Sequence, residues 1–528
     1  MLELLIKNGT VVDGTGASPF RADVGVAQGR IAVVATGLDQ EPARVVIDAS
    51  HLHIAPGFID PHTHSDLPLL VDPRAQSKIR QGVTTEVIGN CGYTFAPVSG
   101  PAVDEVSDKA RTVGMTVTWR TMGEYLERLR TPGTALNVVP LAGHNAIRGS
   151  VVGFDDVQPT PQQQAAMEQM VEEAMEQGAR GLSTGLYYPP GYYATTEEII
   201  GLARAAARHG GIYASHIRSE SDLLLEALQE AIEIGVQADI RVEIAHLKLE
   251  GYRNWQNIDQ LLALLEDVQA RGLAVGFDQY PYIACNTWLA GVLPYWAQAG
   301  GYRGVAQRLQ SPENRARLLQ DWDENPIEWD NRSGARDWTE VVVSDSWNMP
   351  DLLGKTIAQV AEERGQDPKE TVFDLIVASE GLISCVWFTQ REEIVEQLMH
   401  HPLVAVGSDG SSLSAEGILG ARKVHPRNYG TFPRVLGRYV RDKGVLSLEE
   451  AVRKMTSLTA ERYGLTDRGV VRPGAWADLA LFDASTVFDT ATFAEPHQYP
   501  VGIPHVIVNG ELVLHNGEHT GALAGCLL

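Results

Sequence analysis

His62 and His64 stand at the end of an apolar run, residues 54–64, that reads Ile-Ala-Pro-Gly-Phe-Ile-Asp-Pro-His-Thr-His. In a β-strand, side chains two residues apart point to the same face, so both imidazoles would point the same way. Two imidazoles that converge at the end of a buried strand indicate half of a metal site. The other half has to come from other strands that end at the same place.

A thiol, two histidines and a carboxylate end other strand-like runs of the chain. They are Cys91, His216, His246 and Asp409. Zinc prefers such ligands, and an incomplete set of protein ligands leaves a position for water. Each residue alone is more simply a buried structural residue, but together with the first two histidines they predict a metal centre. His144 ends a further run, and either a substrate contact or a structural role would explain it.

These residues can meet only if the strands that carry them end at one face, and the middle of the chain predicts such strands. Strand-like runs end near His62, Cys91, His144, Gly185, His216, His246, Tyr282 and Asp409. Between many of them, apolar residues recur at helical spacing. The expected helices include residues 161–178, 196–209, 223–235 and 258–272. Alternating strands and helices predict a (β/α)8 TIM barrel, which gathers its active site at the carboxyl ends of its strands.

The two ends of the chain carry a different pattern, with short alternating segments separated by Gly and Asn. This pattern is typical of antiparallel β structure and predicts a small β-sandwich domain built from residues 1–53 and 471–528. The barrel domain then covers residues 54–470. Between its seventh and eighth strands lies a long insertion, residues 283–402, which forms either a lid or substrate wall or a peripheral subdomain with its own core.

Composition excludes several classes of protein. The 528 residues carry a formal net charge of −24, which disfavours nucleic acid as a partner because phosphate binding needs clustered Lys and Arg. No run approaches the ~20 apolar residues of a membrane span. The four cysteines are far apart and form no C-x-x-C pattern, so reduced thiols and the cytoplasm are expected. We therefore expect a soluble protein whose partner is a small-molecule substrate.

Seven motifs resemble those of the amidohydrolase superfamily and, within it, of the N-acyl-D-amino-acid deacylases (D-aminoacylases). They lie at residues 56–66, 82–92, 181–190, 214–220, 244–248, 278–282 and 407–410, so the resemblance spans nearly the whole chain. The His-x-His opening is shared across the superfamily. The Gly-Asn-Cys-Gly segment around Cys91 and the Ser-Thr-Gly-Leu segment at 183–186 are specific to the deacylase branch.

The resemblance implies a zinc site with particular roles for the residues named above. Cys91, His216 and His246 would hold one tightly bound zinc ion. His62 and His64 would form a second, weaker site, with Cys91 as a bridging ligand. Asp409 would act as general acid and base.

The resemblance also implies residues that hold the α-carboxylate of the substrate. These are Lys248, Tyr282 and Arg422, with Arg427 as an alternative to Arg422. Lys248 lies two residues after His246, on the same side of an extended strand, which favours a role in the site. A fixed cation would anchor an N-acylated amino acid by its carboxylate.

The expected reaction is zinc-dependent hydrolysis of the amide bond of N-acyl-D-amino acids. The preference for the D configuration comes from the resemblance alone. Alternatives are another linear amide, such as an N-carbamoyl, N-succinyl or dipeptide substrate, or a barrel that has lost chemistry and serves as a scaffold. Residues 181–186 contain no lysine, which argues against the carboxylated-lysine site of the dihydroorotases, hydantoinases and phosphotriesterases.

Overall fold

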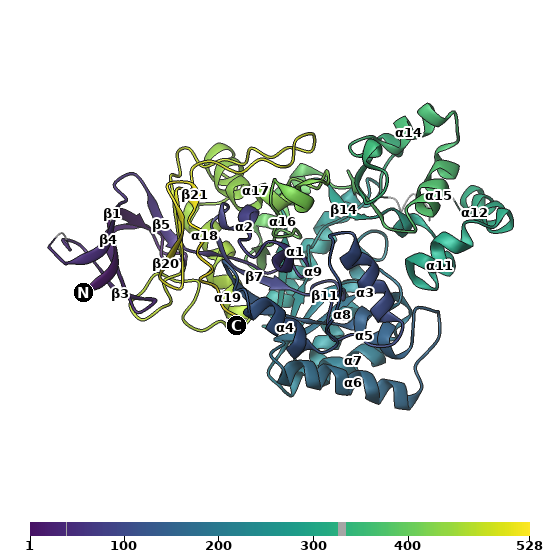
Figure 1. Cartoon of the computed structure of the whole chain (residues 1–528), viewed down its shortest axis with the longest axis horizontal. Helices are drawn as coiled ribbons and strands as arrows, with labels where there is room; N and C mark the ends of the chain where they lie inside the picture. Colours follow the sequence, from purple (N-terminus) through teal and green to yellow (C-terminus); the bar gives the residue numbers. More distant parts are fainter. Residues whose placement is uncertain (39, 326–333) are drawn as a thin grey trace.

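The computed structural model describes residues 1–38, 40–325 and 334–528. The molecule is elongated (Figure 1). Strands from both ends of the chain lie together at one end, parallel strands and their helices form the middle, and helices of the insertion form the other end. Within the described ranges, no helix has both the length and the apolar character needed to cross a membrane.

The middle of the molecule is built on parallel strands in two sheets, of three and six strands, and within each sheet the neighbours pair in the order of the sequence. They are β6 (Phe58–Asp60), β7 (Val83–Ile88), β8 (Asn137–Pro140), β9 (Ala142–Gly143), β10 (Gly181–Gly185), β11 (Ile212–His216), β12 (Arg241–Ile244), β13 (Val275–Gln279) and β17 (Val404–Val406). A parallel bridge between Thr63 and Gly410 joins the segments that follow the first and last of these strands. This is an arrangement of the TIM-barrel type, with strands near the predicted positions.

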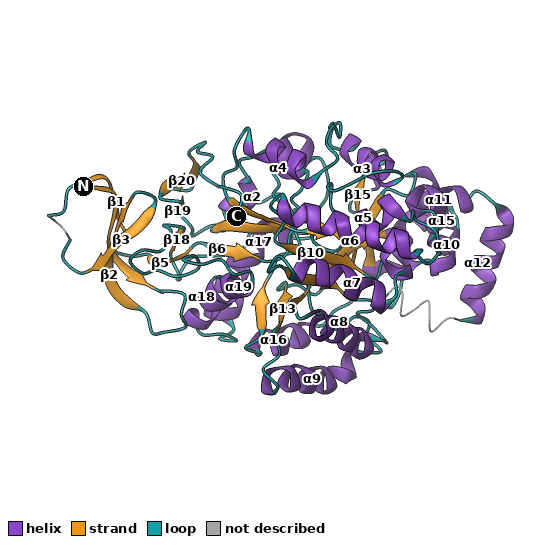
Figure 2. Ribbon diagram, turned by 90° about the horizontal axis from the view of Figure 1, so that it is seen from below, coloured by secondary structure: helices purple, strands orange, loops and turns teal. Residues whose placement is uncertain are grey.

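Helices cover the outside of these strands (Figure 2). Four of them match the predicted ranges to within three residues: α6 (Pro161–Glu176), α7 (Thr196–Ala207), α8 (Leu224–Ala238) and α9 (Ile258–Ala270). Thr160 caps α6, because its side chain accepts a hydrogen bond from the Gln163 amide and the Gln163 side chain accepts one from the Thr160 amide.

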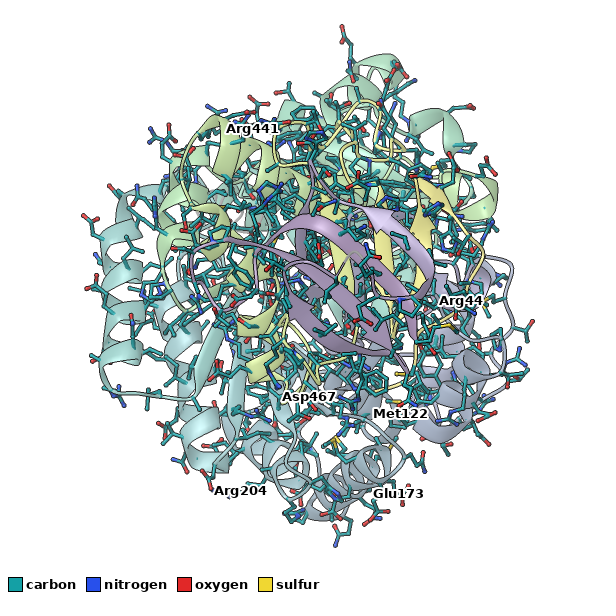
Figure 3. The ribbon with its side chains drawn as sticks, turned by 90° about the vertical axis from the view of Figure 1, so that its left-hand side faces the viewer. Arg44, Met122, Glu173, Arg204, Arg441 and Asp467 are labelled. Atoms are coloured by element: carbon teal, nitrogen blue, oxygen red, sulfur yellow. The ribbon has the colours of Figure 1, made fainter. Side chains whose placement is uncertain are left out.

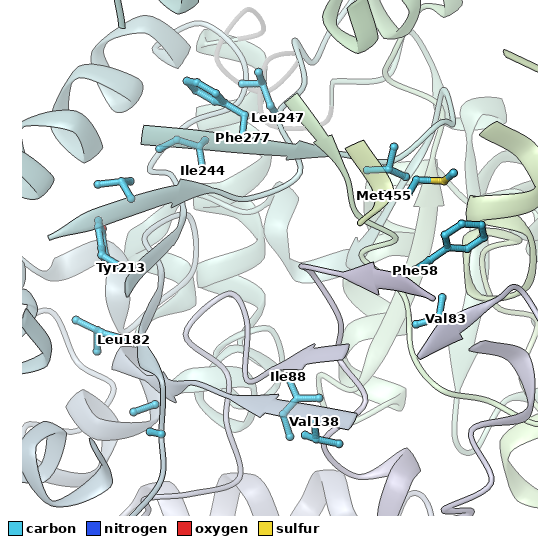
Figure 4. Close-up of a cluster of buried hydrophobic side chains, with 14 of the residues drawn as sticks. Phe58, Val83, Ile88, Val138, Leu182, Tyr213, Ile244, Leu247, Phe277 and Met455 are labelled. Carbon is cyan, nitrogen blue, oxygen red and sulfur yellow. The ribbon is translucent and has the colours of Figure 1, made fainter. Parts of the chain in front are cut away.

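The facing surfaces of strands and helices form one continuous apolar core (Figure 4). Helix α6 buries Met167, Val171 and Ala174, which are spaced at i, i+4 and i+7 and therefore lie on one face. On the strands, side chains such as Leu182, Ile244 and Phe277 are buried against these helices. The remaining helices that contribute to this core include α3 (Ala102–Arg111), α4 (Met122–Arg130), α5 (His144–Val151), α16 (Glu392–His400), α17 (Arg427–Arg434) and α18 (Leu448–Met455).

Both ends of the chain build one nine-stranded sheet. Its strands are β1 (Leu2–Val11), β2 (Phe20–Ala27), β3 (Arg30–Ala35), β4 (Ala43–Asp48), β5 (His53–Pro56), β18 (Leu479–Phe482), β19 (His505–Val508), β20 (Glu511–His515) and β21 (Glu518–His519). Strand β5 pairs with β18, which joins the two ends. Asn509 and Gly510, with φ of 48° and 84°, form the tight turn between β19 and β20 that their types predict. Figure 3 looks onto this sheet and labels Arg44, an exposed residue of β4.

The insertion between β13 and β17 has its own core. It contains an antiparallel sheet of β14 (Cys285–Trp288), β16 (Ile383–Trp387) and β15 (Val341–Ser346), and the helices α10 (Tyr295–Gln298), α11 (Gly301–Arg308), α12 (Pro312–Glu324), α14 (Ile357–Arg364) and α15 (Pro368–Ala378). Residues 326–333 of the predicted insertion lie outside the described residues. Helix α16 buries Ile394 and Leu398 in the core of the parallel strands.

Candidate metal centre and substrate cavity

Six residues from five strand ends meet at the carboxyl side of the parallel strands. His216 is the last residue of β11, and the others follow β6, β7, β12 and β17 within four residues. Their potential ligand atoms form three overlapping groups, each with atoms within 4.8 Å of one another: His62, His64 and Cys91; Cys91, His216 and His246; His62, His246 and Asp409. The structure thus brings together all six residues that the strand ends indicated.

Cys91 lies at the centre of this cluster. Its Sγ atom is 3.3 Å from His62 Nε2 and 3.5 Å from His246 Nε2. Burial raises the pKa of the Cys91 thiol, but the charges of His62 and His246 outweigh burial, so the pKa lies well below its ordinary value. Cys91 is therefore available as a thiolate, which is the form that binds metals.

Three residues of the cluster have left-handed backbone conformations. The φ angles are 55° at Cys91, 35° at His246 and 50° at Asp409. Residues other than glycine rarely adopt this region, so the surrounding structure must hold them there. The amide of Asp409 donates to the His62 carbonyl oxygen at 2.9 Å, and the amide of His246 donates to Asp278 Oδ1 at 2.8 Å. These bonds turn the chain sharply at the strand ends, where the cluster forms.

The two oxygens of Asp409 have different surroundings. Oδ2 is 2.8 Å from Nη1 of Arg427, whereas Oδ1 is 3.1 Å from Nε2 of His64 and 3.6 Å from Nε2 of His62. Burial raises the pKa of Asp409, but Arg427 first and then His246 lower it well below its ordinary value. The carboxylate is thus ionised, with Oδ1 toward the histidines, where it can accept a proton.

Two carboxylates that sequence reasoning did not assign support the histidines from behind. Glu220 Oε1 is 2.9 Å from Nδ1 of His246 and accepts a hydrogen bond from Nζ of Lys248 at 2.5 Å. Asp278 Oδ2 is 3.5 Å from Nδ1 of His62. Both residues belong to the motifs of the resemblance. A carboxylate as close to the outer nitrogen of a histidine as Glu220 is to His246 fixes the ring and its tautomer, as is usual around metal sites. Asp278 is near His62 but makes no hydrogen bond to it.

The donor set fits a metal ion. Neither ring nitrogen of buried His216 has a hydrogen-bond partner among the described residues. Buried polar atoms without partners are rare and call for an explanation. An imidazole that faces a low-pKa thiol and a second histidine is well explained as a ligand of zinc, which prefers nitrogen and sulfur donors.

The structure separates the four predicted substrate contacts. Lys248 and Arg427 line the cavity next to the cluster. Arg422 also lines the cavity, but it lies in a different part, where its guanidinium is 2.8 Å from Asp345 and donates to Thr112. Tyr282 is buried in contact with Arg434 and is not among the described residues that line the cavity.

His144 directly follows strand β9, as the sequence pattern predicted. It begins helix α5, is buried, and its Nε2 lies 2.8 Å from Oε1 of Glu198. Arg148 contacts the same carboxylate. This buried ion-pair network supports the structural alternative for His144.

One cavity of about 350 Å³ adjoins the cluster. Cys91, His216, His246 and Asp409 lie in its wall. Other parts of the wall come from α3 and from the antiparallel sheet of the insertion, including Trp288 and Trp387. The insertion therefore supplies part of the wall of the cavity, in addition to having its own core.

Comparisons with known proteins identify the family and several relatives of the chain. The amidohydrolase family model matches residues 45–278 and 352–514. The chain is 37% identical to D-aminoacylase of Alcaligenes xylosoxydans xylosoxydans, over 100% of this chain and 97% of the relative. It is 36% identical to N-acyl-D-aspartate deacylase of the same organism, over 98% and 93% of the two chains.

One solved structure is similar to this chain over its whole length. The N-acyl-D-glutamate deacylase of Bordetella bronchiseptica, complexed with zinc and a phosphonate inhibitor that mimics the tetrahedral intermediate, has a TM-score of 0.82 and 34% identity. The similarity covers 100% of this chain and 99% of that one.

Proposed function

The chain belongs to the amidohydrolase family, and on that premise we propose that it is a zinc-dependent enzyme that hydrolyses N-acyl-D-amino acids. The products are a carboxylate and a free D-amino acid. The observation that carries the proposal is the joint placement of Cys91, His216, His246 and Asp409 in the wall of one cavity. The names of the similar enzymes, all deacylases of D-amino-acid derivatives, support it.

We assign the metal ligands as the resemblance to the deacylases implied. Cys91, His216 and His246 would hold a tightly bound zinc ion, and His62 and His64, with Cys91, would hold a weaker second one. The short contacts of Cys91 to His62 and His246 support a shared thiolate. Zinc, when bound, supplies a water of lowered pKa and polarises a carbonyl group.

In this reaction, Asp409 transfers a proton from the attacking water to the leaving group. Oδ2 is held by Arg427, so Oδ1 is the oxygen that faces the histidine cluster. Oδ1 accepts the proton of the attacking water and returns it to the departing amide nitrogen. Arg427 keeps the carboxylate ionised before the reaction and fixed in one orientation.

Lys248 and Arg427 are the cations that we assign to the α-carboxylate of the substrate. Both line the cavity beside the cluster, and Arg427 takes the role that the resemblance gave to Arg422. Glu220 holds the Lys248 ammonium group in place. We assign Tyr282 to the packing around Arg434, because it is buried away from the cavity lining.

The two arginines can be distinguished by a matched pair of substitutions. Arg427→Met should lower kcat/KM for N-acetyl-D-leucine by about 100-fold or more, since it removes a charge-assisted contact to substrate and the partner of Asp409. Arg422→Met should lower it by less than about 10-fold, because among the described residues Arg422 contacts Asp345 and Thr112 and not Asp409. Steady-state kinetics of both variants measures this. A larger loss in Arg422→Met would restore the original assignment.

The proposed reaction is tested by assaying purified protein of known zinc content. The panel contains N-acetyl amino acids in both configurations, with N-carbamoyl, N-succinyl and dipeptide compounds. We expect about one tightly bound zinc per chain and turnover of the N-acyl-D compounds. Turnover confined to L substrates, or to N-carbamoyl compounds or dipeptides, would contradict the proposed substrate. It would not contradict the assignment of the metal site.

We further propose that the parallel strands close into a (β/α)8 barrel over residues 54–470 with the insertion at 283–402. The bridge between Thr63 and Gly410 supports closure. The terminal segments, 1–53 and 471–528, would then form the β-sandwich domain, which their shared apolar core supports.

We also propose that the protein is cytoplasmic and that its partner is a small-molecule substrate. All four cysteines are free, as in a reducing compartment, although one of them, Cys526, is exposed. The cavity of about 350 Å³ has the size of a small-molecule site.

A further inference from the structure

One lysine lies in the cavity wall away from the residues assigned above. Lys109, in the last turn of α3, lines the same cavity as Cys91 and Asp409. Its side chain is only 15% exposed, so the ammonium group is largely removed from bulk water. An ammonium group in such a place is stable only with partners for its charge.

Aromatic rings surround this ammonium group. Lys109 Nζ is 4.2 Å from the ring centre of Tyr93, 5.0 Å from that of Trp288 and 5.3 Å from that of Tyr302. Ring faces stabilise a cation electrostatically. They are weak acceptors compared with a carboxylate, so the three N–H donors of Lys109 keep capacity for an anionic partner.

Lys109 forms a salt bridge with Glu105, one turn earlier on α3, at the long end of hydrogen-bond distance. Oε1 of Glu105 lies 3.5 Å from Nζ. Glu105 and Tyr302 line a small neighbouring hollow of about 40 Å³, which shares Tyr93, Tyr188 and Trp288 with the main cavity. Among the described residues, Glu105 and Tyr302 do not line the main cavity itself. Glu105 therefore approaches the ammonium group from behind and leaves its cavity side accessible.

The other cations of the cavity wall are more tightly paired. The contacts are Lys248 to Glu220 at 2.5 Å, Arg422 to Asp345 at 2.8 Å and Arg427 to Asp409 at 2.8 Å. Of the Lys and Arg side chains that the described part of the chain places in this wall, Lys109 has the longest contact to a carboxylate. Among these four cations, Lys109 is therefore the one best able to bind an anionic ligand.

A group bound at Lys109 would be separated from the metal cluster by two aromatic rings. The ring centres of Tyr93 and Tyr188 are 5.7 Å apart, and those of Tyr188 and His216 are 4.9 Å apart. A substrate whose amide lies at the cluster would thus reach Lys109 with a part several bonds away from the amide. The α-carboxylate is too close to the amide to do so.

We propose that Lys109 is a specificity-determining residue that binds a second carboxylate of the substrate, several bonds from the scissile amide. The inference rests on the proposed deacylase function. The carboxylate can come from the side chain of an acidic D-amino acid or from the far end of a dicarboxylic acyl group such as succinyl. Burial lowers the pKa of Lys109, and a bound carboxylate would offset this cost of burial.

The experiment compares acids with amides of nearly the same shape. The pairs are N-acetyl-D-glutamate with N-acetyl-D-glutamine, and N-succinyl-D-leucine with N-succinamoyl-D-leucine. The zinc-loaded enzyme should prefer the acid in one pair by about 10- to 100-fold in kcat/KM, which corresponds to one charge-assisted hydrogen bond. The pair that shows the preference identifies the source of the carboxylate.

Substitutions then assign the preference to Lys109. Lys109→Met should remove most of the preference through KM and change the amide substrates by less than about 3-fold, whereas Lys109→Arg should keep it. The matched control is Lys369→Met. Lys369 lies 5.1 Å from the ring centre of Trp322 and 2.8 Å from Asp323, and among the described residues it does not line the cavity. This control should behave like the wild type.

Three outcomes would overturn the inference. They are equal turnover of acid and amide in both pairs by the wild type, an equal loss for acid and amide in Lys109→Met, and retention of the full preference in that variant. The first of these needs only the wild-type enzyme, so the inference can be tested even if Lys109→Met does not fold. Failure to hydrolyse any of the four compounds and N-acetyl-D-leucine would instead contradict the proposed function itself.

Discussion

Replacing Asp409 by Asn lowers kcat by about 100- to 10,000-fold, which is the contribution of a positioned general acid and base. Asparagine has almost the same shape but cannot accept and return the proton at Oδ1. The zinc content should stay at the wild-type value, because Cys91, His216 and His246 remain. Steady-state kinetics and elemental analysis of the same preparation measure both quantities.

The cavity offers a matched control for this substitution. Asp345 is also a carboxylate of the cavity wall, and it lies 2.8 Å from Arg422 as Asp409 lies 2.8 Å from Arg427. Among the described residues, Asp345 belongs to none of the three groups of potential metal ligands, and its ion-pair partner is Arg422. Asp345→Asn should change kcat by less than about 10-fold. Equal losses in the two variants would show that Asp409 acts through its arginine pair and not through proton transfer.

Cys91→Ala should have the second large effect, a loss of bound zinc together with activity. Loss of an outer hydrogen-bonding partner of a metal ligand typically weakens metal affinity about 10- to 100-fold, and loss of the ligand itself should exceed this. The zinc content after dialysis against a weak chelator should therefore fall far below one equivalent. A Cys91→Ala protein that retains the full equivalent of zinc would contradict the assignment.

Cys385→Ala is the control for the thiol. Cys385 is a free cysteine that is fully buried in the core of the insertion. Alanine there removes an apolar contact and lowers stability somewhat, but it should leave the zinc content at the wild-type level. Comparing the two variants separates loss of a ligand from general destabilisation.

The metal cluster could be predicted from the sequence because strand ends obey simple geometry. The runs before Cys91, His216, His246 and Asp409 are short, apolar and bounded by turns, and parallel strands end at a common face. Neither a helix nor a disulfide had to be placed correctly to find these residues. The four helices α6 to α9 were predictable for a similar reason, since each carries a regular apolar face and lies between two strands.

The substrate contacts could not be predicted in the same way. Strand β13 ends at Gln279, so the alternation that would have aimed Tyr282 no longer applies three residues later. Arg422 and Arg427 lie beyond β17, and only Arg427 is fixed by the start of helix α17. Glu220 follows β11 by four residues, and beyond the strand the residue spacing does not predict where a side chain points. These positions depend on loop conformation, which in turn depends on long-range packing.

The nine-stranded sheet built from both ends of the chain affects the order of events on the ribosome. Pro56 of β5 pairs with Leu479 of β18, about 420 residues later in the sequence. At a synthesis rate of about 5–20 residues per second, β5 therefore waits roughly 20 to 85 s before its second neighbour exists. During this time, the parallel strands can form while one edge of the N-terminal sheet is still exposed. The last segment to emerge thus completes the first strands to be made, so nascent chains of this protein are most prone to associate with each other before β18 leaves the ribosome.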